Sequence, residues 1–209
     1  MAEKFRFYTL WIIGICAIVY IFQLIIPGLT DLFVLNNRVI YNYEIWRLLT
    51  AIFIHGSIGH IFYNMVALVL FGLILEKLIG AKKFLLVFLL SGIIANIISV
   101  NFYPASLGAS GAIMGVIGCL AAIQPFKMVW AYGPVPVIVA AIAYVFIDIF
   151  GVFYPMGVGN IAHLSGIGVG LLIGIFIRLK YKDKFQRIRK QRIEIPENYI
   201  RNWEDNFMK

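Results

Sequence analysis

Charged side chains are scarce in this sequence. Aspartate, glutamate, lysine and arginine make up 13% of its 209 residues, against roughly 25% in an average soluble domain. Hydrophobic residues make up 62%, and the mean hydropathy is +0.90. A composition this apolar excludes a large soluble domain and indicates a chain that lies mostly within a membrane.

Cysteine and histidine are also few, with two and three copies respectively. Cys16 and Cys119 lie in apolar stretches, where a cysteine usually serves as a small buried hydrophobe, so neither a disulfide nor a metal site is indicated. We expect no cofactor. His55, His60 and His163 each fall in or beside an apolar stretch. Because ionisable residues are costly in hydrocarbon and usually face a cavity or a partner there, these histidines indicate a polar site.

Six apolar stretches have about the length that crosses a bilayer. They are Tyr8–Ile26, Ile58–Leu75, Phe84–Val100, Gly108–Ile123, Val135–Phe153 and Asn160–Ile177. A helix of about 17–25 residues spans a hydrocarbon core of about 30 Å, and the fourth stretch is the shortest. The short alternating segments typical of membrane barrels do not occur in the sequence. The sequence therefore predicts an all-α polytopic fold with six transmembrane helices over residues 1–179, followed by a basic cytoplasmic tail over residues 180–209.

Basic residues predict the orientation of these helices. With both termini in the cytoplasm, every lysine and arginine except Arg38 and Arg47 lies on the cytoplasmic side, in agreement with the positive-inside rule. The first stretch exceeds the core of a signal peptide, and Pro27-Gly28-Leu29 is a poor cleavage site, which favours a retained anchor. Without an organelle signal, a prokaryotic plasma membrane is favoured. The second, fourth and sixth helices then begin at the external side.

Eight basic residues crowd the chain where the sixth stretch ends. They are Arg178, Lys180, Lys182, Lys184, Arg187, Arg189, Lys190 and Arg192. A solvated flank at the inner membrane surface accounts for them, and attraction to anionic lipid headgroups would add about 1 kcal/mol per basic residue. Because the tail is tethered to six helices, no nucleic-acid partner is expected.

A serine and a histidine begin two of the predicted helices. Ser110 follows Pro104 and Gly108, which interrupt the preceding segment, so it lies in the first turn of the fourth helix. Unpaired N–H groups in that turn favour developing negative charge. His163, in the sixth helix, is a suitable base because imidazole takes and returns a proton near neutral pH. Packing between helices is the alternative role for a membrane serine.

Small residues line one face of each of these two helices. They are Gly111 and Gly115 in the fourth helix, and Ala162, Gly166, Gly170 and Gly174 in the sixth. Such faces allow two backbones to approach closely. Because both helices begin at the external side, Ser110 and His163 are expected to share one depth near the external surface.

Two further polar residues follow the start of the second helix. His60 and Asn64 are four residues apart, hence on one face, and both side chains can donate hydrogen bonds. Donors aimed at an oxygen that becomes anionic contribute several kcal/mol of transition-state stabilisation. A satisfied polar pair between helices is the alternative interpretation.

Two acidic residues lie near the ends of predicted helices. Asp148, near the outer end of the fifth, is a candidate third member of the site, but it could equally cap the next turn or face water. We therefore expect a Ser–His dyad that requires no acid. Glu76, at the inner end of the second helix, is followed by lysines and is expected to be structural.

Four segments carry these features in order along the chain: Trp46-Arg47, His55-Gly-Ser-Ile-Gly-His60-Ile-Phe-Tyr-Asn64, Gly108-Ala-Ser-Gly111 and Ala162-His163-Leu-Ser-Gly166-Ile-Gly-Val-Gly170. Together they resemble the rhomboid family of intramembrane serine proteases in its basic six-helix form. The resemblance implies that Ser110 is the nucleophile and His163 its general base, and that His60 and Asn64, with the Ser110 N–H, line the oxyanion hole. It implies a structural first loop, and a gate formed by the fifth helix and the loop after it.

Met114 departs from the family pattern, which commonly has an aromatic residue four positions after the nucleophile. A thioether can make a favourable contact with an imidazole, so the orientation of His163 can survive this change. The resemblance implies transmembrane protein substrates. The alternatives are an inactive rhomboid-like protein that binds membrane clients and a small transporter that uses the histidines and Asp148 as a proton path, although no internal repeat supports the latter.

Overall fold

A computed structural model describes residues 6–130, 133–154, 157, 159–182, 185, 198, 201 and 206. Internal contacts separate two compact units, Met1–Ile175 and Phe176–Lys209. The first unit holds every site discussed below. Most of the predicted tail, 180–209, lies outside the described residues.

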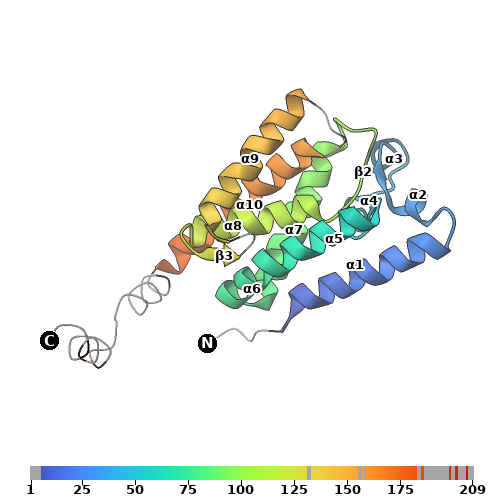
Figure 1. Ribbon diagram of the computed structural model, residues 1–209. Helices are drawn as coiled ribbons and strands as arrows, with labels where there is room; N and C mark the ends of the chain where they lie inside the picture. The colour runs from blue at the N-terminus through green and yellow to red at the C-terminus, as the bar shows by residue number, and fades with distance from the viewer. Residues whose placement is uncertain are drawn as a thin grey trace. The chain divides into compact units, whose positions relative to one another are not determined.

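Six long helical segments occupy the six predicted stretches (Figure 1). They are α1 (Tyr8–Ile25), the continuous run of α5 (Ile58–Ala67), the π-helical turn η1 (Leu68–Gly72) and α6 (Leu73–Ile79), then α7 (Ala81–Ser99), α8 (Ser110–Ile123), α9 (Val137–Phe153) and α10 (Asn160–Lys180). Within the described residues, α1, the α5–α6 run, α7 and α10 are long and apolar enough to cross a membrane. The predicted all-α polytopic fold is confirmed.

The described parts of the loops contain short elements. Those after α1 are α2 (Leu29–Phe33), β1 (Leu35–Asn36), α3 (Arg38–Tyr41) and α4 (Arg47–Thr50). β1 pairs antiparallel with β2 (Ala105–Ser106), and β3 (Met128–Trp130) pairs antiparallel with β4 (Pro134–Pro136). The β1–β2 pair ties the first loop to the segment that leads into α8.

Helix α8 is the buried centre of the first unit. It has 14 residues, and all of them except Ser110 are buried. At 1.5 Å per residue it is about 21 Å long, shorter than a hydrocarbon core of about 30 Å. An apolar helix that is buried all round packs against protein rather than lipid. A helix this short does not reach both surfaces of such a core.

Glycines bring α8 and α10 into backbone contact, as the small-residue faces predict. A Cβ atom on Gly166 would overlap the carbonyl oxygen of Gly111, and one on Gly170 would overlap that of Gly115. The same spacing continues with Gly174 against the Cys119 backbone. Since both sequence numbers rise together by four, the two helices run parallel. Their starts, which carry Ser110 and His163, therefore lie side by side.

Arg47 organises the first loop. Its side chain is 1% exposed, and its Nη1 donates hydrogen bonds to the carbonyl oxygens of Asp31, at 2.7 Å, and Val34, at 2.8 Å. Its Nε is paired with the Glu44 carboxylate. One guanidinium thus joins three parts of the loop, a structural contact of the kind implied for this residue.

Glu76 joins the start of α1 to the end of the α5–α6 run. It is fully buried, and its carboxylate accepts hydrogen bonds from the backbone N–H groups of Tyr8 and Thr9, both at 2.9 Å, and from the Thr9 hydroxyl at 2.8 Å. These N–H groups are in the first turn of α1, where they lack intrahelical acceptors and where negative charge is favourable. The contact agrees with the structural role expected for Glu76.

Replacing Glu76 by alanine is expected to lower the free energy of unfolding by about 2–4 kcal/mol, because the first turn of α1 loses a charged acceptor. Unfolding of the purified protein in mixed micelles, followed by circular dichroism, measures the change. Thr9→Val removes only the hydroxyl donor and is expected to cost about 1 kcal/mol. Equal effects of the two substitutions would contradict this account.

Candidate active site

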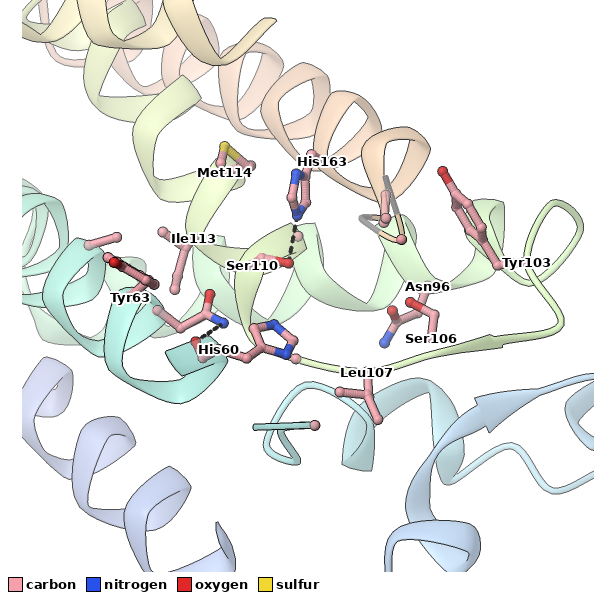
Figure 2. A pocket seen from close by; sticks show the side chains of 18 of the residues that line it. His60, Tyr63, Asn96, Tyr103, Ser106, Leu107, Ser110, Ile113, Met114 and His163 are labelled. Carbon is pink, nitrogen blue, oxygen red and sulfur yellow. Dashed lines mark hydrogen bonds between the residues drawn. The ribbon is translucent and has the colours of Figure 1, made fainter. Parts of the chain in front are cut away.

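Ser110 and His163 are in hydrogen-bond contact. The Oγ of Ser110 lies 2.7 Å from Nε2 of His163, and Figure 2 shows the two side chains pointing toward each other from α8 and α10. Ser110 is the first residue of α8. His163 lies in the first turn of α10, where its backbone N–H donates a hydrogen bond to the Gly159 carbonyl. A serine hydroxyl and an imidazole at this distance can exchange a proton.

Gly108 shapes the approach to Ser110. Its φ of +112° is rarely adopted by L residues, and a Cβ there would lie 2.6 Å from Nε2 of His60 and 3.8 Å from Nδ2 of Asn64. Its N–H donates to the Ala51 carbonyl at 2.8 Å, which anchors the turn. Glycine is therefore required at this position for both conformation and space.

His60 and Asn64 face the same turn from α5. The Ser57 hydroxyl caps this helix by accepting from the His60 N–H at 3.1 Å. Asn64 donates one amide hydrogen to the His60 carbonyl at 3.0 Å. An amide nitrogen carries two hydrogens, so the second remains for another acceptor.

One cavity of about 800 Å³ joins the predicted site residues. Its lining includes His60, Asn64, Ser110 and His163, which come from three helices far apart in the sequence. Met114, the residue that departs from the family pattern, also lines it (Figure 2). The fold therefore brings together the four site residues named from the sequence, in a space large enough for a peptide segment.

Asp148 contacts the imidazole of His163 directly, so of the placements that the sequence left open it neither caps the next turn nor faces water. It is 4% exposed, and its Oδ1 lies 2.9 Å from Nδ1 of His163. Asp148 is on α9, and the sequence did not show which way this helix faces. The imidazole of the expected dyad thus contacts Ser110 through Nε2 and the Asp148 carboxylate through Nδ1.

His55 lies behind the site, outside the membrane-spanning helices. Its ring is 2% exposed and meets the His60 ring edge to face, with centroids 5.1 Å apart. Burial, with repulsion from His60 as a smaller cause, lowers the pKa of His55 to about 4. Its backbone N–H and carbonyl both bond to the Gln23 amide. A ring with this pKa is neutral near pH 7, and it packs against the ring of His60.

Two further contacts hold the start of α10 and were not predicted. The Ile161 N–H donates to the Tyr103 hydroxyl at 3.0 Å, and Tyr103 lines the cavity. The Asn160 side chain fills the space where Gly151 lacks a Cβ. A tyrosine in a short polar loop gives no sequence signal of this role. An acid within an apolar stretch does give such a signal, which is why Asp148 is a candidate from the sequence.

The fold and the cavity define a class of protein: a polytopic helical membrane protein with a serine–histidine pair inside the helix bundle. Comparison with known families agrees. The Rhomboid domain matches residues 42–180, well over half of the chain, so the chain belongs to the rhomboid family. Membership of this family supports an intramembrane protease function and an integral, multi-pass membrane location.

Three curated relatives, each from a different organism, are similar to parts of the chain. RHOMBOID-like protein 4 of Arabidopsis thaliana is 30% identical over 148 residues, which cover 69% of this chain and 37% of that protein. Rhomboid protease GluP of Bacillus subtilis is 44% identical over 86 residues, 41% of this chain and 17% of that protein. Rhomboid-like protease 3 of Toxoplasma gondii is 40% identical over 91 residues, 43% of this chain and 34% of that protein. The chain thus spans well under half the length of these relatives.

Proposed function

We propose that this protein is a serine endopeptidase that hydrolyses peptide bonds in or near transmembrane segments of membrane proteins. The observation that carries the proposal is the 2.7 Å contact between Ser110 Oγ and His163 Nε2 at the wall of a cavity within the helix bundle. Serine is a weak nucleophile unless a base takes its proton, and this contact supplies the base.

In the acylation step, Ser110 Oγ forms a bond to the carbonyl carbon of the substrate while its proton moves to Nε2 of His163. His163 returns this proton to the leaving nitrogen as the peptide C–N bond breaks, and an ester on Ser110 remains. Water then attacks the ester carbonyl while His163 takes a proton from it. As the ester C–O bond breaks, His163 returns this proton to Ser110 Oγ, and the carboxylic acid product leaves.

His60, Asn64 and the Ser110 N–H are proposed to bind the oxygen that becomes negative. The first turn of α8 supplies N–H groups without intrahelical acceptors, and Asn64 retains one amide hydrogen. The approach of His60 and Asn64 to Gly108, two residues before the nucleophile, supports this assignment. Preorganised donors aimed at such an oxygen contribute several kcal/mol to transition-state stabilisation.

Substrate entry is proposed beside α9, for segments with helix-breaking residues near their outer end. Of its 17 residues only Val137, Ala141, Asp148 and Gly151 are buried. The rest of the helix carries large exposed apolar side chains, including Ile142, Phe146, Ile147, Phe150 and Phe153. A helix held along such a narrow stripe is displaced at lower cost than the buried α8, which supports it as the gate.

The site is proposed to face the external side of a prokaryotic plasma membrane, with both termini cytoplasmic. The parallel run of α8 and α10 supports a common side for Ser110 and His163, and the positive-inside rule supports the choice of side. The basic tail, 180–209, is proposed to contact anionic headgroups at the inner surface.

Covalent labelling tests the proposed nucleophile. A fluorophosphonate probe added to the purified protein is expected to modify Ser110, identified by mass spectrometry of the labelled peptide, because an activated serine attacks phosphorus readily. His163→Ala, which removes the base, is expected to label far more slowly. A transporter or an inactive client-binding protein would show no label on Ser110 while remaining folded, and that result would overturn the proposal.

A further inference from the structure

We propose that Asp148 is a positioning residue that holds the imidazole of His163 in the orientation and tautomer that Ser110 requires. The inference rests on the proposed function, and it adds a third group to the expected Ser–His dyad.

Both ring nitrogens of His163 are engaged at once. Nε2 lies 2.7 Å from Ser110 Oγ, and Nδ1 lies 2.9 Å from Asp148 Oδ1. The His163 side chain is 12% exposed and that of Asp148 5% exposed, so little water competes for either contact. Two fixed partners on opposite sides of a planar ring leave it one orientation.

The chemistry of the partners assigns the hydrogen on the ring. An ionised carboxylate is only an acceptor, so Nδ1 must carry the hydrogen that Asp148 binds. A neutral imidazole with hydrogen on Nδ1 has a free lone pair on Nε2, and Nε2 then accepts the hydrogen of the Ser110 hydroxyl. The opposite tautomer would present N–H to the serine and could not take its proton.

The cost of burying Asp148 also requires a partner. Carboxylates inside a membrane helix are expensive unless they pair or face a polar cavity, and Asp148 is directed at His163 rather than at the lipid. When His163 takes the serine proton, it becomes a cation beside this carboxylate. The same contact that orients the neutral ring thus stabilises the charged one.

The placement of Asp148 on α9 links the base to this helix. In the outer half of α9 the buried residues are Asp148 and Gly151, and their partners, His163 and Asn160, are both in the first turn of α10. This part of α9 is held to α10 by the packing at one glycine and by one hydrogen bond. That is less contact than the glycines provide between α8 and α10. Movement of α9 away from α10 would therefore withdraw the acceptor from Nδ1 of His163.

Asp148→Asn tests the role by kinetics. The amide keeps the shape but removes the charge and lets Nδ2 donate to Nδ1, which favours the wrong tautomer. With a transmembrane substrate in proteoliposomes, kcat is expected to fall on the order of 10²- to 10⁴-fold, while KM stays within about threefold. Asp31→Asn, which removes an equal charge from an exposed side chain, is the matched control and is expected to keep the wild-type kcat.

Nitrogen NMR tests the same role by reading the tautomer of the His163 ring directly instead of the activity. The chain has three histidines, so histidine labelled with ¹⁵N gives three rings, and His163→Ala identifies the signal of interest. At pH 8 the His163 ring is expected to carry its hydrogen on Nδ1, and Asp148→Asn is expected to shift the population toward Nε2–H. A purely structural contact would leave the tautomer unchanged by the substitution.

Three outcomes overturn the inference. They are a wild-type His163 with its hydrogen mainly on Nε2, a tautomer that Asp148→Asn leaves unchanged, and a loss confined to KM in that variant. Each of these leaves the proposed function standing if the wild-type protein cleaves and its Ser110 is labelled. A wild-type protein that neither cleaves nor labels would refute the proposed function, and the inference with it.

Discussion

Cleavage of a transmembrane substrate is expected to fall on the order of 10⁴-fold or more when Ser110 is replaced by alanine. The substitution removes the only atom proposed to bond with the substrate carbonyl, and His163 loses the hydroxyl 2.7 Å from its Nε2. The rest of the site is left in place, because the N–H groups of α8 and the donors on α5 are unchanged. Cleavage is measured with purified protein in proteoliposomes, by the appearance of the product fragment.

Ser165→Ala is the matched control for this experiment. Ser165 is on α10, two residues after His163. Its hydroxyl donates a hydrogen bond to the Ile161 carbonyl of the same helix at 2.6 Å. Its loss is expected to leave cleavage near the wild-type rate, because a back-bonded hydroxyl adds little to a helix. Wild-type cleavage by Ser110→Ala would refute the proposed nucleophile, even if the protein binds membrane clients.

Gly170→Ala is expected to lower cleavage at least 100-fold without touching any group of the site. A methyl group there would overlap the carbonyl oxygen of Gly115, and its next nearest atoms also belong to the α8 backbone. Backbone cannot rotate away as a side chain would, so α8 and α10 must separate. A displacement of about 1 Å between a nucleophile and its base costs on the order of 10²-fold in rate.

Gly168→Ala provides the control for Gly170→Ala. It is the same change two residues earlier in α10, but a Cβ at Gly168 meets nothing within 4 Å. Alanine in a helix interior is favoured over glycine by about 0.5–1 kcal/mol, so this variant is expected to be as stable as the wild type or slightly more stable. Cleavage rates and thermal unfolding midpoints are compared for both. Equal activity in the two variants would show that close packing of α8 and α10 does not set the Ser–His distance.

The membrane fold was predictable because hydrocarbon imposes simple rules on sequence. Stretches of apolar residues long enough to span it, and glycines at every fourth position, indicated the six helices and the contact between α8 and α10. The predicted start of the fourth stretch at Gly108 differs by two residues from that of α8, which begins at Ser110. Gly108 has a left-handed φ and belongs to the turn.

Side-chain direction was not predictable at Asp148. The residues around it in α9 are almost all apolar, so the stretch carries no periodic pattern that marks a buried face, and the lipid and the protein interior are equally apolar. From the sequence alone, the Asp148 side chain could equally cap the next turn, face water or contact His163. The backbone contact between α8 and α10, and the packing of Gly151 on Asn160, removed that freedom.

Composition and spacing alone placed this chain in a membrane and named Ser110, His163, His60 and Asn64 as one candidate site, because hydropathy, charge bias and helical period act locally along a chain. Tertiary structure decided the distances. It brought Nε2 of His163 to the serine hydroxyl and Nδ1 to Asp148, since hydrogen bonds require atoms within about 3 Å, and only the packing of helices far apart in sequence brings atoms that close.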